Sequence, residues 1–260
     1  MRETTVALDT PAGPMETFIV HPEGAGPFPA VVLYMDIWGV REELFDLARR
    51  IAVVGYCCLV PDLYHRQGRV RTSFRNAEGR MISVALLTEE QKEVVRAPLR
   101  KLTDAMVLED TEALFRYLDA RPEARRGPMA CIGYCMGGRF VFRAAGRYPE
   151  RFRVAASLHG SDLVTDKPDS PHLDVARAQG ELYCGFAEKD RYALPEIVAA
   201  IDATLNNVPG LRYHAALHRG ADHGYALPDR DVHDREGFNR DWEIFFAMLH
   251  RQMPQYVPPA

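Results

Sequence analysis

The chain has 260 residues, of which 47% are hydrophobic, enough to bury the core of one large α/β domain. Its net charge of −4 gives no electrostatic reason to expect nucleic acid or an anionic membrane as a partner. We expect neither a signal peptide nor a membrane span, because no stretch approaches the roughly 18 apolar residues that a span requires. The five cysteines cannot all pair, which favours reduced thiols in a cytoplasmic protein.

Short apolar, β-rich runs alternate with longer helical patterns, which predicts a single α/β domain over residues 1–260, with a mostly parallel central sheet and helices on both faces. An antiparallel hairpin is expected to open the sheet, and the predicted strands are TTVAL, METFIV, AVVLYM, CCLVPD, MACIGY, VAASLH, ELYCGFA and RYHAALH. The predicted helices are 41–54, two within 88–120 with Pro98 starting or kinking one of them, 137–148, LPEIVAAIDATL and 236–251.

The hexapeptide GYCMGG, residues 133–138, lies between a predicted strand and a predicted helix. A strand, a sharp turn and a helix form the nucleophile elbow of hydrolases, in which small residues on either side of the nucleophile allow close packing. Cys135 occupies the nucleophile position, and the N-terminus of the following helix favours a thiolate and an oxyanion. A glycine turn with an incidental buried cysteine is the simpler alternative.

A thiol nucleophile needs a base, and the base needs a carboxylate that orients it. In an elbow hydrolase the acid and then the histidine follow the nucleophile, each at the end of a later strand. Asp190 follows the predicted strand ELYCGFA, and His223 lies in the loop between RYHAALH and the last helix. Asp162 is a reserve candidate for the acid, Asp222 would have to fold back on its neighbour, and His159 comes too early in the order. The order predicts a nucleophile–acid–base triad.

Together with the elbow, the segments DIWGV, PDLYHRQG and ADHGY resemble the dienelactone hydrolases, the cysteine-nucleophile branch of the α/β-hydrolase superfamily. The resemblance covers residues 16–250 and implies the α/β-hydrolase fold. It also implies a carboxymethylenebutenolidase-like enzyme without a cofactor, with Cys135, Asp190 and His223 as its triad. The implied oxyanion hole uses the backbone N–H groups of Ile37 and Met136, positions that elbow geometry also favours.

The chain departs from the family pattern at two positions. Asp36 stands where the family has a glutamate that regulates thiolate formation, so the resemblance implies this role for Asp36, with simple capping of the loop as the alternative. The members that cleave dienelactone bind the substrate carboxylate with two arginines, one of them four residues after the catalytic histidine, where this chain has Leu227. Arg230, three residues further on, and Arg80, in a loop rich in arginine, are candidates for this task.

These residues predict a hydrolase that cleaves an ester or lactone of a small organic acid through a thioester acyl-enzyme. Trp38 and Tyr134 are candidates for the pocket wall, with core packing an equally good interpretation, and residues 68–87 are expected to form a wall or lid. The alternatives are a broad-specificity carboxylesterase that acts on neutral esters and a non-catalytic ligand-binding member of the fold.

Other classes of site have weaker support in the sequence. A thiol redox protein would need a resolving cysteine, but Cys131 is expected inside a strand and the chain has no CxxC motif. A compact group of Cys and His ligands and the HExxH pattern are also absent, so no metal site is expected. The expected partner is a small-molecule ester or lactone, and the sequence leaves the oligomeric state open.

Overall fold

A computed structural model describes residues 1–256 of the chain, and its centre is one eight-stranded sheet in the order β1-β2-β4-β3-β5-β6-β7-β8. The first two pairings, β1 with β2 and β2 with β4, are antiparallel, and all others are parallel. The strands are β1 (Arg2–Thr10), β2 (Gly13–His21), β3 (Ala30–Tyr34), β4 (Cys57–Pro61), β5 (Met129–Tyr134), β6 (Phe152–Leu158), β7 (Gly180–Ala187) and β8 (Leu211–His218). The predicted mostly parallel sheet is confirmed.

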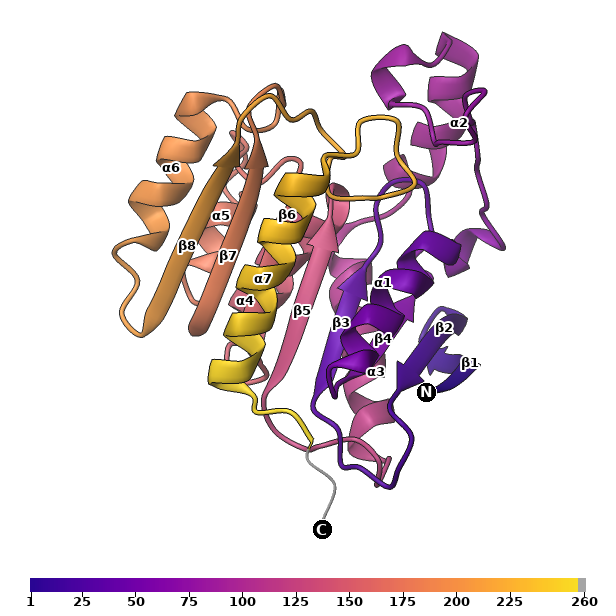
Figure 1. Cartoon of the computed structure of the whole chain (residues 1–260), viewed down its shortest axis with the longest axis vertical. Coiled ribbons are helices and arrows are strands. Elements are labelled where there is room, and N and C mark those ends of the chain that lie inside the picture. The colour runs from indigo at the N-terminus through magenta and orange to yellow at the C-terminus, as the bar shows by residue number, and fades with distance from the viewer. Residues whose placement is uncertain (257–260) are drawn as a thin grey trace.

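Helices cover both faces of this sheet (Figure 1), with α1 and α7 on the face toward the viewer and α3 and α4 behind it. The helices are α1 (Glu42–Val53), α2 (Glu89–Arg100), α3 (Asp104–Asp119), α4 (Met136–Arg147), α5 (Pro171–Val175), α6 (Pro195–Leu205) and α7 (Arg235–Gln252). Within the described residues, no helix combines the length and the apolar character needed to cross a bilayer.

The predicted elements agree with the structure, with small differences at their ends. Every residue of β3, β4, β5 and β7 is buried, which explains why these strands are apolar without interruption. Pro98 lies in the last turn of α2, and the break before α3 comes at residues 101–103. The short helix α5 was not predicted, because five residues are too few to show a helical period.

Residues 68–87 and α2 lie beyond the carboxyl ends of the parallel strands, at the top of the molecule in Figure 1. A small apolar cluster, separate from the main core, joins this part of the chain to Trp38. The cluster consists of Trp38, Met81, Leu87 and Val95, and we call it the cap cluster. The loop predicted to be a wall or lid therefore packs at the edge of the sheet where parallel α/β folds place their ligands.

The turn from β5 into α4 is very tightly enclosed. Cys135 has a φ of 55° and a ψ of −118°, a conformation that costs a side chain-bearing residue energy unless its surroundings impose it. A Cβ atom at Gly133 would lie 2.2 Å from the carbonyl oxygen of Gly137, and one at Gly137 would lie 2.5 Å from that of Tyr34. Only glycine fits at these two positions, which accounts for the spacing of the GYCMGG motif.

We expect Gly133→Ala to lower the free energy of unfolding by about 3 kcal/mol, because the added methyl group overlaps backbone that cannot move freely. The matched control is Gly79→Ala, where φ is also positive at 78° but no atom lies within 4 Å of the added Cβ. This control should cost only about 1–2 kcal/mol, the penalty of a left-handed backbone. Urea denaturation measures both, and equal losses would contradict the proposed role of close packing at Gly133.

Candidate active site

The three side chains that the sequence predicts to form a triad follow three strand ends at one edge of the sheet. Cys135 follows β5 and is partly exposed, Asp190 follows β7, and His223 lies in the loop after β8. His223 donates a hydrogen bond from Nδ1 to Oδ2 of Asp190 over 2.6 Å. The other oxygen of Asp190 accepts the backbone N–H of Tyr192 over 2.9 Å, so the carboxylate is held in place. The ring of Tyr192 also packs against that of His223.

The environment of His223 favours its protonated form. Burial alone would lower the pKa of His223, but the neighbouring Cys135 sulfur and the hydrogen bond that His223 donates to Asp190 outweigh it and raise the pKa to about 10. The buried Nε2 atom has no hydrogen-bond partner among the described residues, so it is free to exchange a proton with the nucleophile or a substrate. The contacts around His223 therefore favour its imidazolium form.

The backbone of Cys135 is held by contacts from the end of β6. Its N–H donates to the carbonyl oxygen of Leu158 over 3.1 Å and approaches Nδ1 of His159 at 3.2 Å. Burial lowers the pKa of His159 well below its usual value, so its ring is neutral and Nδ1 can accept. His159, which was set aside on chain order, thus supports the elbow through its ring and packs 5.0 Å from the ring of His223.

The two N–H groups of the predicted oxyanion hole come from neighbouring segments. Ile37 lies in the loop after β3 and Met136 begins α4, and among residues 1–256 neither backbone N–H donates a hydrogen bond. The hydroxyl of Tyr64 donates to the carbonyl oxygen of Ile37 over 3.0 Å and lies 3.5 Å from the sulfur of Met136. Tyr64, from the PDLYHRQG segment, therefore links the two sides of the oxyanion hole.

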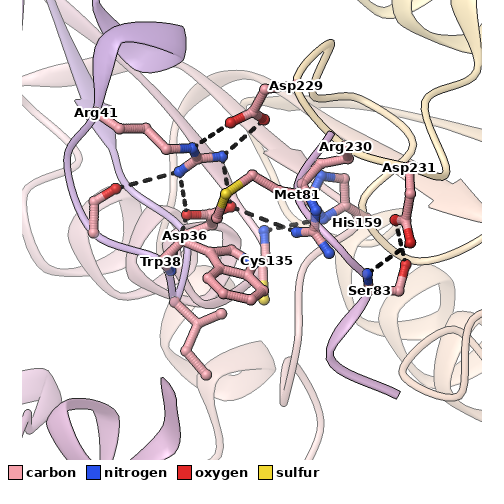
Figure 2. A network of polar contacts seen from close by, with 12 residues as sticks. Asp36, Trp38, Arg41, Met81, Ser83, Cys135, His159, Asp229, Arg230 and Asp231 are labelled. Carbon is pink, nitrogen blue, oxygen red and sulfur yellow. Dashed lines mark hydrogen bonds and ion pairs between the residues drawn. The ribbon is translucent and has the colours of Figure 1, made fainter. Parts of the chain in front are cut away.

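Asp36 is fully buried beside the elbow, and both of its carboxylate oxygens already accept hydrogen bonds (Figure 2). Arg41 donates to Oδ1 over 2.7 Å and to Oδ2 over 3.1 Å. The backbone N–H of Trp38 also donates to Oδ1, and Arg230 forms a longer ion pair of 3.8 Å with Oδ2. The implied thiol-regulating role of Asp36 stays a prediction, and this geometry gives the carboxylate a different set of partners.

Arg230 is a nearly buried cation close to the nucleophile, with only 3% of its surface exposed. Its guanidinium lies over the ring of Trp38, 5.4 Å from the centroid, and its Nε atom has no partner among the described residues. The ion pair with Asp36 at 3.8 Å is longer than a hydrogen bond. Arg230 therefore has unused capacity to bind an anion, whereas Leu227 is buried in the main core.

The side chains of the remaining candidates serve other contacts. Tyr134 is fully buried in the main core, in line with the core-packing interpretation. Arg80 donates to the carbonyl oxygens of Pro228 and Arg230, so it joins the lid loop to the loop after His223. The reserve acid Asp162 faces Arg139 at 3.7 Å and, within residues 1–256, forms no hydrogen bond or ion pair with His223.

The chain matches the family model described as "Dienelactone hydrolase family" over residues 15–253. A Synechocystis protein named "putative carboxymethylenebutenolidase" is 25% identical over 87% of both chains. A protein of the same name from Methylorubrum extorquens is 31% identical over 63% of this chain and 52% of its own length. A solved structure from Klebsiella pneumoniae, named "putative dienelactone hydrolase", superposes with a TM-score of 0.78 at 22% identity, covering 98% of this chain and 99% of its own. The match to the family model over nearly the whole chain shows that this chain belongs to the dienelactone hydrolase family.

Proposed function

We propose that this dienelactone hydrolase-like enzyme cleaves a small ester or lactone through a thioester on Cys135. The observation that carries the proposal is the hydrogen bond of 2.6 Å between His223 and Asp190, beside a cysteine on a tightly enclosed elbow. The cysteine-containing branch of the family provides the precedent for this nucleophile, and the free N–H groups of Ile37 and Met136 provide sites for an oxyanion.

In the first step the thiolate of Cys135 attacks the carbonyl carbon, a C–S bond forms, and the negative charge moves to the carbonyl oxygen. The N–H groups of Ile37 and Met136 bind this oxyanion. When the tetrahedral intermediate collapses, the C–O bond breaks and His223 gives its proton to the departing alkoxide or enolate. In a lactone that oxygen stays attached, so the ring opens while the acyl group remains on sulfur.

In the second step neutral His223 takes a proton from water, and the hydroxide that forms attacks the thioester. The C–S bond breaks, the carboxylic acid leaves, and the thiolate is restored beside protonated His223. Amides are poor substrates for such a site, because the tetrahedral intermediate expels the thiolate before the amine. The enzyme is therefore expected to act on esters and lactones and not on peptides.

The substrate we favour carries a carboxylate that binds Arg230. A buried guanidinium with a single ion pair of 3.8 Å and an unpartnered Nε can offer two parallel N–H groups to a carboxylate. Trp38 would form the wall beneath it, since the two side chains already stack. A neutral ester is the second candidate, favoured by the buried Leu227 at the position of the family's arginine.

Cys135→Ala should lower the turnover of both a dienelactone and p-nitrophenyl acetate by at least about a thousandfold, because the residual oxyanion hole cannot replace a nucleophile. Cys57→Ala is the matched control, since Cys57 is a buried cysteine of β4 away from the elbow. Steady-state kinetics with purified proteins measure both. Wild-type turnover in Cys135→Ala would remove the basis of the proposal.

Arg230→Gln should raise KM for trans-dienelactone by about ten- to a hundredfold and leave KM for p-nitrophenyl acetate nearly unchanged, because only the lactone carries a carboxylate. Arg75→Gln is the control, since Arg75 is exposed and bonds within its own loop. Equal losses for both substrates, or none, would exclude Arg230 as the carboxylate site and favour a neutral ester.

The raised pKa of His223 predicts how stability changes with pH. A histidine whose pKa is higher in the folded than in the unfolded state adds stability that is complete below pH 6.5 and lost as pH rises through about 10. The difference in free energy of unfolding between wild type and His223→Gln should therefore shrink between pH 6.5 and 10. Urea denaturation of both proteins at pH 6.5 and at pH 10 measures this difference. In a Cys135→Ala background this difference should change less with pH. A difference between wild type and His223→Gln that does not depend on pH would refute the proposed ion pair between His223 and Cys135.

A further inference from the structure

We propose that Arg41 is a positioning residue of this hydrolase: it locks the oxyanion loop (residues 36–39) to the histidine loop (residues 219–234), and it keeps Asp36 out of thiol chemistry. The inference rests on the proposed function in one respect, since the oxyanion loop matters only if an acyl group is attacked at Cys135. The proposal is argued from hydrogen bonds between segments that are far apart in the sequence. Arg41 and Asp229, for example, are 188 residues apart.

Every N–H group of the Arg41 guanidinium can be assigned to a hydrogen bond. A guanidinium has five such donors in a fixed fork, and five hydrogen bonds leave this one. Two go to Asp36, two go to Asp229 and one goes to the carbonyl oxygen of Gly39, with lengths from 2.6 to 3.2 Å. Figure 2 shows Arg41 between the two carboxylates. Lysine has only three donors and cannot reproduce this arrangement.

The site of these contacts is largely shielded from water. The side chains of Arg41, Asp36 and Asp229 are 12%, 0% and 9% exposed. Both carboxylates raise the pKa of Arg41 above its usual value, so the cation persists at any working pH. Ion pairs that exclude water are weakly screened, and removing one partner leaves the other charge buried without compensation. This contact therefore holds its three segments far more firmly than an exposed pair would.

At one end the contact determines the shape of the oxyanion loop. The Asp36 carboxylate, which binds Arg41, also accepts the backbone N–H of Trp38. The backbone carbonyl oxygen of Asp36 accepts the N–H of Gly39 over 3.1 Å. Ile37, whose N–H is proposed to bind the oxyanion, lies inside this turn. A shift of the Asp36 carboxylate would therefore tilt the peptide plane that carries the oxyanion donor.

At the other end the contact anchors the histidine loop and the lid. Asp229 precedes Arg230, and its carbonyl oxygen accepts the N–H of Met81 over 2.7 Å. The N–H of Asp231 donates back to the carbonyl oxygen of Met81, and its carboxylate accepts both the N–H and the hydroxyl of Ser83. Arg41 thus connects the oxyanion loop, the segment that carries Arg230 and the lid in one rigid unit.

This arrangement also assigns a different task to Asp36. Both of its oxygens face cations, Arg41 at hydrogen-bond distance and Arg230 at 3.8 Å. Moving this carboxylate toward the thiol would break its hydrogen bonds with Arg41, and these bonds shape the oxyanion loop. This leaves His223, among the described residues, as the proposed acid–base partner of Cys135.

The test compares Arg41→Lys, Asp229→Asn and the double variant, with Arg49→Lys as the matched control. Arg49 lies on α1, the helix that Arg41 precedes, and it also binds several carboxylates, but these lie on the exposed surface. We expect kcat for p-nitrophenyl acetate to fall about ten- to a hundredfold in each Arg41 and Asp229 variant, with KM changed less than about threefold, because only the transition state uses the oxyanion donor. The double variant should be no slower than the worse single variant, because both remove the same contact.

Alkylation of Cys135 by iodoacetamide across pH 5–10 gives a readout that does not depend on turnover. Asp36→Asn and Arg41→Lys should show the wild-type pH dependence, whereas His223→Gln should not. A displaced profile in Asp36→Asn would show that Asp36 acts on the thiol, and wild-type kcat in both Arg41→Lys and Asp229→Asn would exclude the positioning role. Circular dichroism identifies any variant that fails to fold, in which case Asp229→Asn, which keeps the shape of the side chain, decides the question. Loss of the proposed function itself would appear separately, as turnover in Cys135→Ala.

Discussion

The backbone of Cys135 is the constraint on which the rest of the site depends. A residue with a side chain holds a φ of 55° only where its neighbours leave no alternative, and here Gly133 and Gly137 let β5, α4 and the end of β3 approach within contact distance. The same close approach exposes the N–H of Met136 at the start of α4, next to the loop that carries Ile37. One tight turn thus places Cys135, the proposed nucleophile, next to the N–H of Met136, the proposed oxyanion donor.

Charge is the second organising feature, and the site separates its charges into groups with different tasks. Asp190 and the neighbouring Cys135 raise the pKa of His223, which suits the proposed role of His223 as the proton donor to the leaving oxygen. Arg41 is saturated by two carboxylates and is proposed to hold the loops, whereas Arg230 is more deeply buried and has, among the described residues, one ion-pair partner at 3.8 Å. In this account the less satisfied arginine is the one that recognises the substrate.

Much of the fold and the core of the site follow from local patterns in the sequence. The GYCMGG motif predicts a turn between a strand and a helix, and the order of Asp190 and His223 after later strands predicts which edge of the sheet they share; the structure places them there. The family membership was likewise predictable, because the motifs that carry it are short and contiguous.

The contacts that position the side chains of the site could not be predicted from local patterns in the sequence. Arg41 and Asp229 are 188 residues apart, and nothing near either residue marks it as a partner of the other. His159 was dismissed because chain order identifies a base but not a ring that accepts a backbone N–H from the elbow. Tyr64 lies in a quoted motif, yet only the folded chain shows that its hydroxyl reaches Ile37. Interactions between distant loops depend on how the loops are folded, which no periodicity encodes.

The central claim is that an acyl group passes through the sulfur of Cys135, and rapid-quench mass spectrometry of the intact enzyme with p-nitrophenyl acetate tests it most directly. The account predicts a transient acetyl adduct that appears within the first turnover, maps to the peptide containing Cys135, and is released by hydroxylamine as a thioester should be. An acetyl group on any other residue, or steady turnover with no adduct in His223→Gln and wild type alike, would contradict it.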